Sequence, residues 1–394
     1  MTTNPIRVLM YAHGFAPLVG GVETYVMNLA QGLATRDAAP RLEVTLATQT
    51  PAGNFDDGAL PFRVVRRPAM WTLAGLVRRA DVVHLAGPAF LPMLLALLLR
   101  RKMVVEQHGY QAVCPNGLML HQPTMTVCPG HFQAGHYLEC VRCNTAEVGT
   151  ARSLRLLLLT FPRLWMCRRA AVNAPISAHV QERTQLPRAR VIYYGIPDGG
   201  MAAALPATMN GAAPCFAYVG RLVSEKGPVV LLHAAKRLHN EGRAFRVRFI
   251  GDGPERARLE KLIRESGLAG EVTITGFLGG NDLAAALEDV NAVVMPSLCE
   301  ETAGLAAIEQ MMRGRLVIVS DIGGLTEVVG EAGLKFAPGD ADELAGCLRR
   351  VLDDPGVVAS FGPQARRRAL HKFHLQTMVD EHAQLYRNLT GGRA

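Results

Sequence analysis

Short apolar runs alternate with amphipathic stretches through the N-terminal half of the chain. The apolar runs are rich in β-branched residues and predict strands, whereas the stretches between them have helical spacing. Near-continuous apolar strands that alternate with helices predict a parallel sheet covered by helices on both faces. The predicted strands are IRVLMYA (6–12), RLEVTLAT (41–48), PFRVVRR (61–67), ADVVHLAG (80–87), KMVVEQHG (102–109) and VIYYGIP (191–197).

Two other stretches of this half also predict helices. Residues 17–36, PLVGGVETYVMNLAQGLATR, predict a glycine-rich turn that leads into a helix. FLPMLLALLL (90–99) is about half as long as the roughly 18 apolar residues of a bilayer span, so it predicts a buried helix. The N-terminus lacks the small-residue cleavage site of a secretory signal, so we expect the chain in the cytoplasm.

The same pattern restarts after a stretch of small residues, 198–213, which predicts a linker. Strands are predicted at 215–222, 245–253, 271–278, 291–297 and 315–321, and helices at 227–242, 254–268, 281–290 and 341–354. A chain of 394 residues also exceeds what one core usually serves. We therefore expect two doubly wound α/β domains, residues 1–197 and 214–373, and a last helix within residues 374–394.

The composition is that of a globular protein with an excess of positive charge. Hydrophobic residues make up 49% and charged residues 19% of the sequence, which excludes a disordered scaffold. The formal charge of +8 indicates an anionic partner, such as a nucleotide, an anionic lipid or a nucleic acid. Basic residues are not interleaved with aromatic ones as in nucleic-acid modules, so we expect no nucleic acid.

Part of this charge lies in a segment without acidic residues, 148–180. Its apolar run LRLLLLTFPRLW is accompanied by Arg152, Arg155, Arg163, Arg168 and Arg169. Such a segment is typical of a helix on an anionic membrane surface. It is equally typical of a core-packing helix with a solvated arginine face, and the sequence leaves both interpretations open.

Charged residues of the second half follow the predicted strands at the point where each strand ends. Arg221 and Lys226 follow the first of these strands, and Glu301 follows the fourth. Ligands of open α/β sheets bind outside the carboxyl ends of the strands. These side chains are therefore expected at one edge of the sheet.

The stretch CEETAGLAAIEQ predicts a loop followed by a helix. Gly304 permits a tight turn, the helix begins near Leu305, and Glu309 lies about one turn inside it. A helix N-terminus suits a phosphate, and a carboxylate on each side of it suits a ligand with hydroxyl groups at both ends. A nucleotide sugar has this order of groups: ribose, diphosphate, hexose.

Four motifs resemble, in order, those of the family 4 retaining glycosyltransferases of the GT-B fold. They are PLVGGVETYVMNLAQGL (17–33), YVGRLVSEKG (218–227), EETAGLAAIE (300–309) and VSDIGGLTEVV (319–329). The resemblance implies two Rossmann-like domains that face a cleft, with the C-terminal helix crossing back to the N-terminal domain. The N-terminal domain would bind the acceptor, and the C-terminal domain would bind the nucleotide sugar.

The resemblance implies that Arg221 and Lys226 neutralise the diphosphate leaving group. Departure of a nucleoside diphosphate develops negative charge, which a metal or fixed cations must stabilise. The Asp-x-Asp sequence in GDADEL is predicted to open a helix, with Asp340 as its cap and Asp342 in its first turn. We therefore expect no metal or other cofactor in catalysis.

The resemblance also assigns the other residues of the donor site. Glu301 would hold the hexose hydroxyls, helped by backbone amides near Gly304 and Leu305, and Glu309 would bind the ribose. Glu301 is chosen over its neighbour because Gly304 and Glu309 follow it at the spacing of the family motif.

The N-terminal domain would contribute three residues. Gly20 and Gly21 would approach the diphosphate and the acceptor, and His108, in EQHG, would reach the transferred sugar. A simple tight turn and a satisfied core histidine are the alternatives. Tyr194, in YYGIP, stands where the family usually has Asn.

Four of the eight cysteines lie in one loop, residues 110–145. In a cytoplasmic protein their spacing predicts a metal site rather than a disulfide framework, with free thiols or a redox pair as the alternative. A structural zinc ion would hold a loop that otherwise has little core. The predicted ligands are Cys114, Cys128, Cys140 and Cys143.

The implied activity is that of a retaining hexosyltransferase in polysaccharide or glycoconjugate synthesis. Its donor would be a UDP- or GDP-hexose, its acceptor a saccharide or a polyprenyl-linked precursor, and its location cytoplasmic or peripheral on the inner face of the cell membrane. A nucleotide-sugar 2-epimerase of the same fold and a catalytically silent sugar-nucleotide binding protein are the alternatives. The Glu-x7-Glu spacing argues against the epimerase, and the presence of all four charged residues of the donor site argues against the silent protein.

Overall fold

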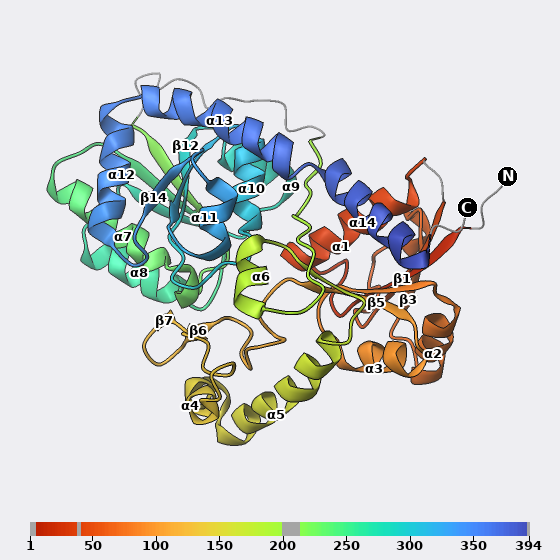
Figure 1. The fold of residues 1–394 in the computed structure, drawn as a ribbon. Helices are drawn as coiled ribbons and strands as arrows, with labels where there is room; N and C mark the ends of the chain where they lie inside the picture. The colour runs from red at the N-terminus through yellow and green to blue at the C-terminus, as the bar shows by residue number, and fades with distance from the viewer. Residues whose placement is uncertain (1–4, 38–40, 199–212, 392–394) are drawn as a thin grey trace. The chain divides into compact units, whose positions relative to one another are not determined.

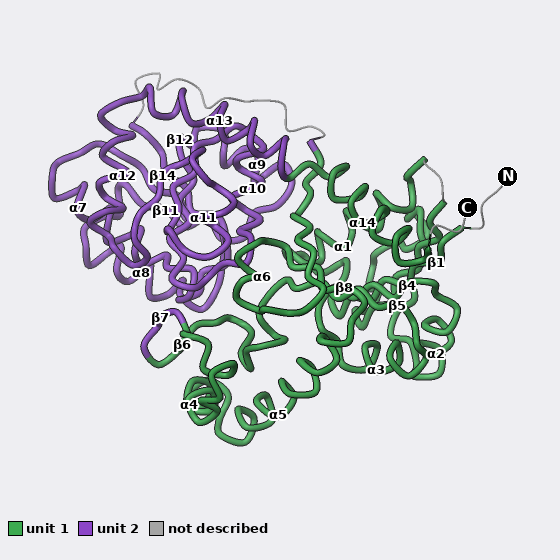
Figure 2. Tube along the Cα trace, in the orientation of Figure 1, with its two compact units in different colours: residues 1–123, 128–197, 373–394 green, residues 124–127, 198–372 purple. Residues whose placement is uncertain are grey.

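The computed structural model describes residues 5–37, 41–198 and 213–391, and the chain divides into two compact units (Figure 2). Unit 1 consists of residues 1–123, 128–197 and 373–394, and unit 2 consists of residues 124–127 and 198–372. Most of the predicted linker, residues 199–212, lies outside the described residues. Each unit contains one six-stranded sheet.

The sheet of unit 1 is parallel throughout. Its strands are β1 (Ile6–Ala12), β2 (Leu42–Thr48), β3 (Arg63–Arg66), β4 (Val82–Leu85), β5 (Lys102–Gln107) and β8 (Val172–Pro175). They lie in the order β3-β2-β1-β4-β5-β8. The order reverses between β1 and β4, which is the kind of switch point at which open α/β sheets bind ligands.

Helices cover both faces of this sheet. The helices of unit 1 are α1 (Gly21–Ala34), α2 (Met70–Arg79), α3 (Phe90–Leu98), α4 (Tyr137–Val148), α5 (Thr150–Cys167), α6 (Ala178–Thr184) and α14 (Leu375–Thr390), with a short 3-10 helix η1 (Asp57–Ala59). Helices α1 and α14 lie on one face of the sheet, and α2 and α3 lie on the other (Figure 1). The C-terminal helix α14 packs on α1, so the end of the chain belongs to unit 1.

The loop that follows β5 contains the short strands β6 (Leu120–His121) and β7 (Thr126–Val127), which pair with each other. The four clustered cysteines lie in this loop and in α4.

The sheet of unit 2 repeats the same topology. Its strands are β9 (Cys215–Val219), β10 (Arg246–Ile250), β11 (Val272–Gly276), β12 (Val290–Met295), β13 (Leu316–Ser320) and β14 (Leu334–Phe336). They lie in the order β11-β10-β9-β12-β13-β14, all parallel. Every residue of β12 and β13 is buried, as expected of central strands covered on both faces.

The helices of unit 2 are α7 (Pro228–Asn240), α8 (Arg256–Glu265), α9 (Gly280–Ala286), α10 (Leu305–Met312), α11 (Gly323–Val329), α12 (Ala341–Asp353) and α13 (Gly356–Lys372), with a 3-10 helix η2 (Ser224–Lys226). Asp340 caps α12, because its side chain accepts hydrogen bonds from the amides of Asp342 and Glu343. Both units are therefore doubly wound Rossmann-like domains, as the pattern of strands and helices predicted.

One local prediction that is wrong concerns a strand. VIYYGIP (191–197) forms no strand, apart from one isolated bridge between Ile196 and His374. The place beside β5 is taken by β8, whose Pro175 lacks an amide hydrogen and is tolerated because this is an edge strand.

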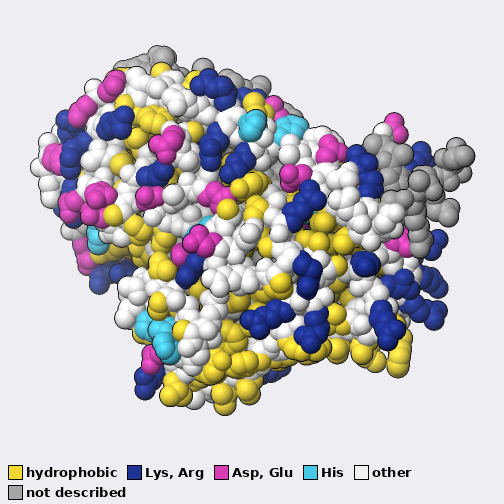
Figure 3. Space-filling model, viewed as in Figure 1, with side chains coloured by type: hydrophobic (Ala, Val, Ile, Leu, Met, Phe, Trp, Pro, Cys, Tyr) yellow, Lys and Arg dark blue, Asp and Glu magenta, His cyan; other side chains and the backbone are white. Residues whose placement is uncertain are grey.

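The predicted helix FLPMLLALLL forms α3, but the prediction that it is buried is wrong. Phe90, Leu91 and Leu98 are exposed by 43%, 40% and 69%. Figure 3 shows hydrophobic side chains gathered on the surface of this part of unit 1. Only one side of the helix is needed to cover the sheet, so an all-apolar sequence leaves apolar side chains on the other side.

Candidate active site

Two loops of unit 2 meet at the carboxyl ends of β9 and β12, the strands that flank its switch point. Residues 220–227 follow β9 and residues 296–304 follow β12. The amide of Leu298 donates a hydrogen bond to the carbonyl of Glu225 at 2.9 Å. Gly227 has a φ of +63°, and a Cβ there would lie 2.0 Å from the Pro296 carbonyl oxygen. The glycine thus permits the close contact that holds the two loops together.

The loop that carries Arg221 is supported by the turn after β10. Gly251 and Gly253 have positive φ, and a Cβ on them would lie 1.9 Å from the carbonyl oxygen of Gly220 and 2.4 Å from that of Leu222. The sequence alone assigned no role to this turn. The Arg221 side chain is 74% exposed, with its guanidinium 4.0 Å from the nearest carboxylate oxygen, on Glu225. A firmly held backbone therefore presents a largely free cation.

Lys226 and Glu301 form an ion pair between the two loops. The hydroxyl of Ser297 donates to the same Glu301 oxygen at 2.7 Å. Burial alone would lower the pKa of Lys226, but the Glu301 carboxylate outweighs it and raises that pKa above its usual value. Burial likewise opposes the charge on Glu301, and Lys226 outweighs it and lowers the pKa of Glu301. Both groups are therefore charged at neutral pH.

The turn before α10 has the geometry that the sequence predicted. Gly304 is the N-cap of the helix with a φ of +67°, and Leu305 is its first residue. The glycines of α11 pack directly behind this loop, because the amide of Gly324 donates to the Glu301 carbonyl at 2.6 Å. A Cβ on Gly324 would lie 2.3 Å from the Thr302 carbonyl oxygen. The motif VSDIGGLTEVV thus supports the loop that carries Glu301.

Glu309 lies on the second turn of α10 and is half-buried. Its carboxylate makes no hydrogen bond or ion pair with another described residue. Burial raises the pKa of Glu309, and Arg313 offsets this rise only in part. An acceptor group that is partly desolvated and without a partner is suited to bind hydroxyl groups of a ligand.

In unit 1, Gly20 is the N-cap of α1 and Gly21 is its first residue. A Cβ on Gly20 would lie 2.4 Å from one carboxylate oxygen of Glu23, and a Cβ on Gly14 would lie 2.3 Å from the other. The loop between β1 and α1 therefore folds against the Glu23 carboxylate, a contact that the sequence analysis missed.

His108 follows β5 and is held on both sides within unit 1. Its Nε2 lies 2.7 Å from Glu106 Oε2, and its Nδ1 lies 2.9 Å from the Tyr194 hydroxyl. The His108 side chain is 5% exposed. Both ring nitrogens thus have protein partners, as in the satisfied histidine that was the alternative to a sugar contact. Contact with a sugar would require His108 to exchange one of these partners.

The carboxylate of Glu106 is the centre of a buried polar network that sequence reasoning missed. The hydroxyl of Tyr25 donates to Oε1, and His382 Nε2 and His84 Nε2 lie 3.0 and 3.2 Å from the same oxygen. Burial opposes the charge of Glu106, but His84 and His108 outweigh it and hold the pKa of Glu106 well below its usual value. The network joins β4, β5, α1 and α14 within unit 1. A glutamate and a histidine inside predicted apolar strands were the only signals of it in the sequence.

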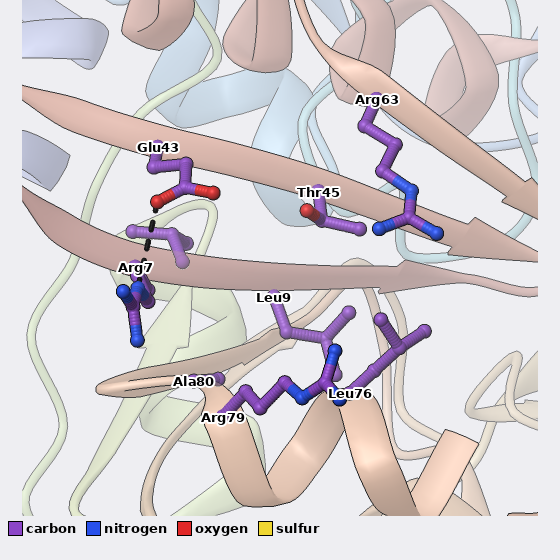
Figure 4. Close-up of a pocket in the computed structure, with 9 residues that line it drawn as sticks. Arg7, Leu9, Glu43, Thr45, Arg63, Leu76, Arg79 and Ala80 are labelled. Carbon is purple, nitrogen blue, oxygen red and sulfur yellow. Dashed lines mark ion pairs between the residues drawn. The ribbon is translucent and has the colours of Figure 1, made fainter. Parts of the chain in front are cut away.

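A separate pocket of about 420 Å³ lies at the opposite edge of the unit 1 sheet (Figure 4). Arg7, Glu43 and Arg63, at the amino ends of β1, β2 and β3, line it together with Arg79 of α2. Arg7 pairs with Glu43 at 3.5 Å. Ligand sites of this fold lie at the carboxyl ends of the strands, so this pocket is not the donor site.

The sequences of both units match known proteins. The sequence model described as Glycosyltransferase Family 4 matches residues 19–198, and that described as Glycosyl transferases group 1 matches residues 208–368. The 2-deoxystreptamine N-acetyl-D-glucosaminyltransferase of Streptomyces fradiae is 31% identical, with 91% of each chain covered. The chain belongs to glycosyltransferase family 4.

Other relatives of this family 4 chain match over part of their length. The 2-deoxystreptamine glucosyltransferase of Streptomyces kanamyceticus is 32% identical over 56% of this chain and 62% of its own. The alpha-D-kanosaminyltransferase of the same organism is 34% identical over 45% of this chain and 46% of its own. The chain thus spans about half to two thirds of the length of these two curated relatives.

Solved structures show that the fold is GT-B. HepE of Anabaena in complex with UDP-glucose has a TM-score of 0.71 at 16% identity and covers 97% of this chain and 100% of that chain. Sucrose-phosphate synthase from Thermosynechococcus elongatus has a TM-score of 0.70 at 23% identity, with 98% and 99% covered. At these identities the likeness concerns the fold alone.

The four clustered cysteines of the family 4 chain are buried and form no disulfide. Burial raises the pKa of Cys140 to about 12, and repulsion from the other three sulfurs adds to the rise. Among the described residues, however, the group of three possible metal-ligand atoms that all lie within 4.8 Å of one another comes from His84, Glu106 and His382. No three of the four cysteine sulfurs lie that close together. Sulfurs of a tetrahedral zinc site lie roughly 3.7 Å apart. The four sulfurs lie in one region but are not spaced as in such a zinc site, so zinc stays a prediction.

The buried network predicts a loss of stability in acid. Burial holds the pKa of His84 below 6.5. As the pH falls below that value, His84 therefore binds a proton in the unfolded state but not in the folded state. The pKa of Glu106 lies below 4.5, so its contribution is lost as the pH falls further. We expect His84→Gln to flatten the decline of the melting temperature between pH 6.5 and pH 5. The slope removed is at most about 1.4 kcal/mol per pH unit.

The exposed His371 provides the control, because His371→Gln is expected to leave the decline unchanged. Equal slopes in the wild type and His84→Gln would contradict the assignment of a neutral, buried His84.

Proposed function

We propose that this chain is a retaining hexosyltransferase that moves a hexose from UDP- or GDP-hexose to a saccharide or polyprenyl-linked acceptor. The observation that carries the proposal is the Lys226–Glu301 pair, held between the loops after β9 and β12 with Ser297 bound to the carboxylate. This site offers a cation, a carboxylate and a glycine-started helix at the switch point of a Rossmann-like unit. A diphosphate and a sugar hydroxyl are the groups that match these partners.

Each charged residue has a role in the proposed reaction. Arg221 and Lys226 stabilise the nucleoside diphosphate as its negative charge develops. Glu301 exchanges its contact with Ser297 for hexose hydroxyls, with the amides near Gly304 and Leu305 beside it. Glu309 accepts hydrogen bonds from the ribose. Two fixed cations supply the charge that a metal supplies elsewhere, so the proposed catalysis needs no metal.

Retention requires the acceptor oxygen to attack the face of the sugar that the diphosphate leaves. The bond between the anomeric carbon and the phosphate oxygen breaks, and the bond to the acceptor oxygen forms. The acceptor proton passes to the departing phosphate oxygen, so no protein base is needed on that face.

The relatives support the substrate classes. Solved structures of HepE contain UDP or UDP-glucose, which favours a uridine nucleotide. The relative from Streptomyces fradiae is named for transfer of N-acetyl-D-glucosamine to 2-deoxystreptamine, a small polyhydroxylated acceptor. We infer that this chain takes a polyhydroxylated or polyprenyl-linked acceptor and works at the cytoplasmic surface of the cell membrane.

The central prediction concerns turnover. Arg221→Ala is expected to lower the rate of nucleotide release from the donor by 10²–10³-fold, or about 2.7–4 kcal/mol, because one stabilising charge is removed. Arg258→Ala, which removes another exposed arginine of unit 2, is the control and should change the rate little. Turnover is measured as UDP or GDP released from hexose donors. An unchanged rate in Arg221→Ala would refute the role of this residue.

Zinc is proposed as a structural ion of the four-cysteine loop. Purified protein should contain one zinc ion per chain, and Cys140→Ser should lower both the zinc content and the melting temperature. Cys347→Ser, in α12 of unit 2, should change neither. Protein that is stable and free of zinc would show that the loop is held by packing alone.

A further inference from the structure

Exposed hydrophobic side chains of unit 1 are concentrated on four helices. Among the described residues, eleven of the fifteen exposed large hydrophobic side chains lie on α2, α3, α4 and α5, which hold 49 of the 394 residues. These helices are neighbours, because α2 contacts α3, α3 contacts α5 and α5 contacts α4. We call these side chains the apolar face: Met70, Trp71, Phe90, Leu91, Leu98, Tyr137, Leu138, Leu154, Leu158, Phe161 and Trp165.

Helix α5 shows most clearly that the exposure is patterned. Ser153, Leu157 and Thr160 are buried and face the protein. A second stripe follows the same helical spacing and is exposed by 41% to 58%: Leu154, Leu158, Phe161 and Trp165. A surface helix of a globular protein normally has one apolar stripe and a polar opposite face. One side of α5 therefore packs on the protein, as the core-packing interpretation predicted, while a second, apolar stripe stays exposed.

Aromatic contacts join the stripe of α5 to α4. The ring of Phe161 lies 5.2 Å from that of Tyr137 and 5.0 Å from that of Phe132. Figure 3 shows the hydrophobic side chains of this part of unit 1 lying together with Lys and Arg among them. The apolar face is thus one surface rather than scattered side chains, and a patch of this kind marks an interaction site.

Three of these four helices carry positive charges only or none, whereas α4 also contains Glu139 and Glu147. Helices α2, α3 and α5 contain no aspartate or glutamate. Nine arginines lie in α2 and α5 or directly after α3 and α5: Arg78, Arg79, Arg100, Arg101, Arg152, Arg155, Arg163, Arg168 and Arg169. All but Arg101 and Arg163 are exposed. The guanidinium of Arg169 lies 3.8 Å from the centre of the Trp165 ring, which places a cation at the edge of the exposed stripe.

We propose that the apolar face of unit 1 binds the surface of an anionic phospholipid bilayer, with α5 lying in the interface. Apolar side chains would enter the boundary between headgroups and acyl chains, where Trp and Tyr are preferred, and the arginines would contact lipid phosphates. No helix among the described residues is long and apolar enough to cross the bilayer, so the contact is with its surface.

The charge pattern favours a bilayer over a second copy of the chain. A symmetric dimer through this face would bring the arginines of one copy towards those of the other, and the cores of protein interfaces are depleted in charge. An anionic surface instead offers partners to all of these arginines at once. The use of such a surface to reach a polyprenyl-linked acceptor rests on the proposed function, whereas binding to lipid does not.

Sedimentation of the full-length chain with vesicles tests the proposal. Binding is expected to phosphatidylcholine vesicles that contain phosphatidylglycerol, and to be much weaker with phosphatidylcholine alone or at high salt. Leu158→Glu and Trp165→Glu should each weaken binding about tenfold or more, because a charge replaces an apolar group that the bilayer would bury. Arg155→Gln should weaken it about fivefold.

Matched controls separate this contact from general effects of charge. Phe277→Glu changes an aromatic residue of unit 2 that is at least as exposed, and Lys261→Gln removes an exposed cation there; neither should change vesicle binding. No binding to anionic vesicles, or equal loss in Phe277→Glu and Leu158→Glu, overturns the proposal. So does a stable dimer that Leu158→Glu dissociates while vesicle binding is absent. Nucleotide release without vesicles is measured in parallel, so failure of the transferase assignment is recognised separately.

Discussion

The ion pair between Lys226 and Glu301 is the contact on which the candidate donor site depends. Its two residues come from the loops after β9 and β12, which flank the switch point of the unit 2 sheet. Glu301 is 9% exposed, and removal of one member of a buried pair costs about 3–5 kcal/mol, because the other charge is left without compensation. The pair therefore keeps the two loops in register. It also holds a cation where a diphosphate can bind and a carboxylate where a sugar can bind.

The glycines around this pair explain how the loops come so close. Gly227 lies on the Pro296 carbonyl, Gly251 on the Gly220 carbonyl and Gly324 on the Thr302 carbonyl, at distances that no Cβ would permit. The charged side chains are thus mounted on backbone that packs directly on backbone. Arg221 and Glu309 differ from the pair, because one is largely exposed and the other has no partner among the described residues. They are the groups left free for a ligand.

Most strands and most helices could be predicted from the sequence, because the length and the spacing of each apolar run distinguish a strand from a helix. The elements that were missed lacked that signal. Strand β8 contains Asn173 and Pro175, and β14 has three residues, so neither forms an apolar run. In the donor site, the spacing of Glu301, Gly304 and Glu309 was readable because all three lie on one loop and helix. The Glu106 network was not, because His84, Glu106 and His382 meet only after β4, β5 and α14 are packed.

The most direct test of the account is the melting temperature of the chain with UDP, GDP and their hexose conjugates, with and without EDTA. A ligand at about 100 times its Kd adds roughly 2.7 kcal/mol of stability, which raises the melting temperature by a few degrees. A donor site built on fixed cations predicts a rise with one nucleotide family that EDTA does not abolish and that Arg221→Ala reduces. Absence of a rise with any nucleotide would contradict a donor site in unit 2, and a rise that EDTA abolishes would contradict stabilisation by fixed cations.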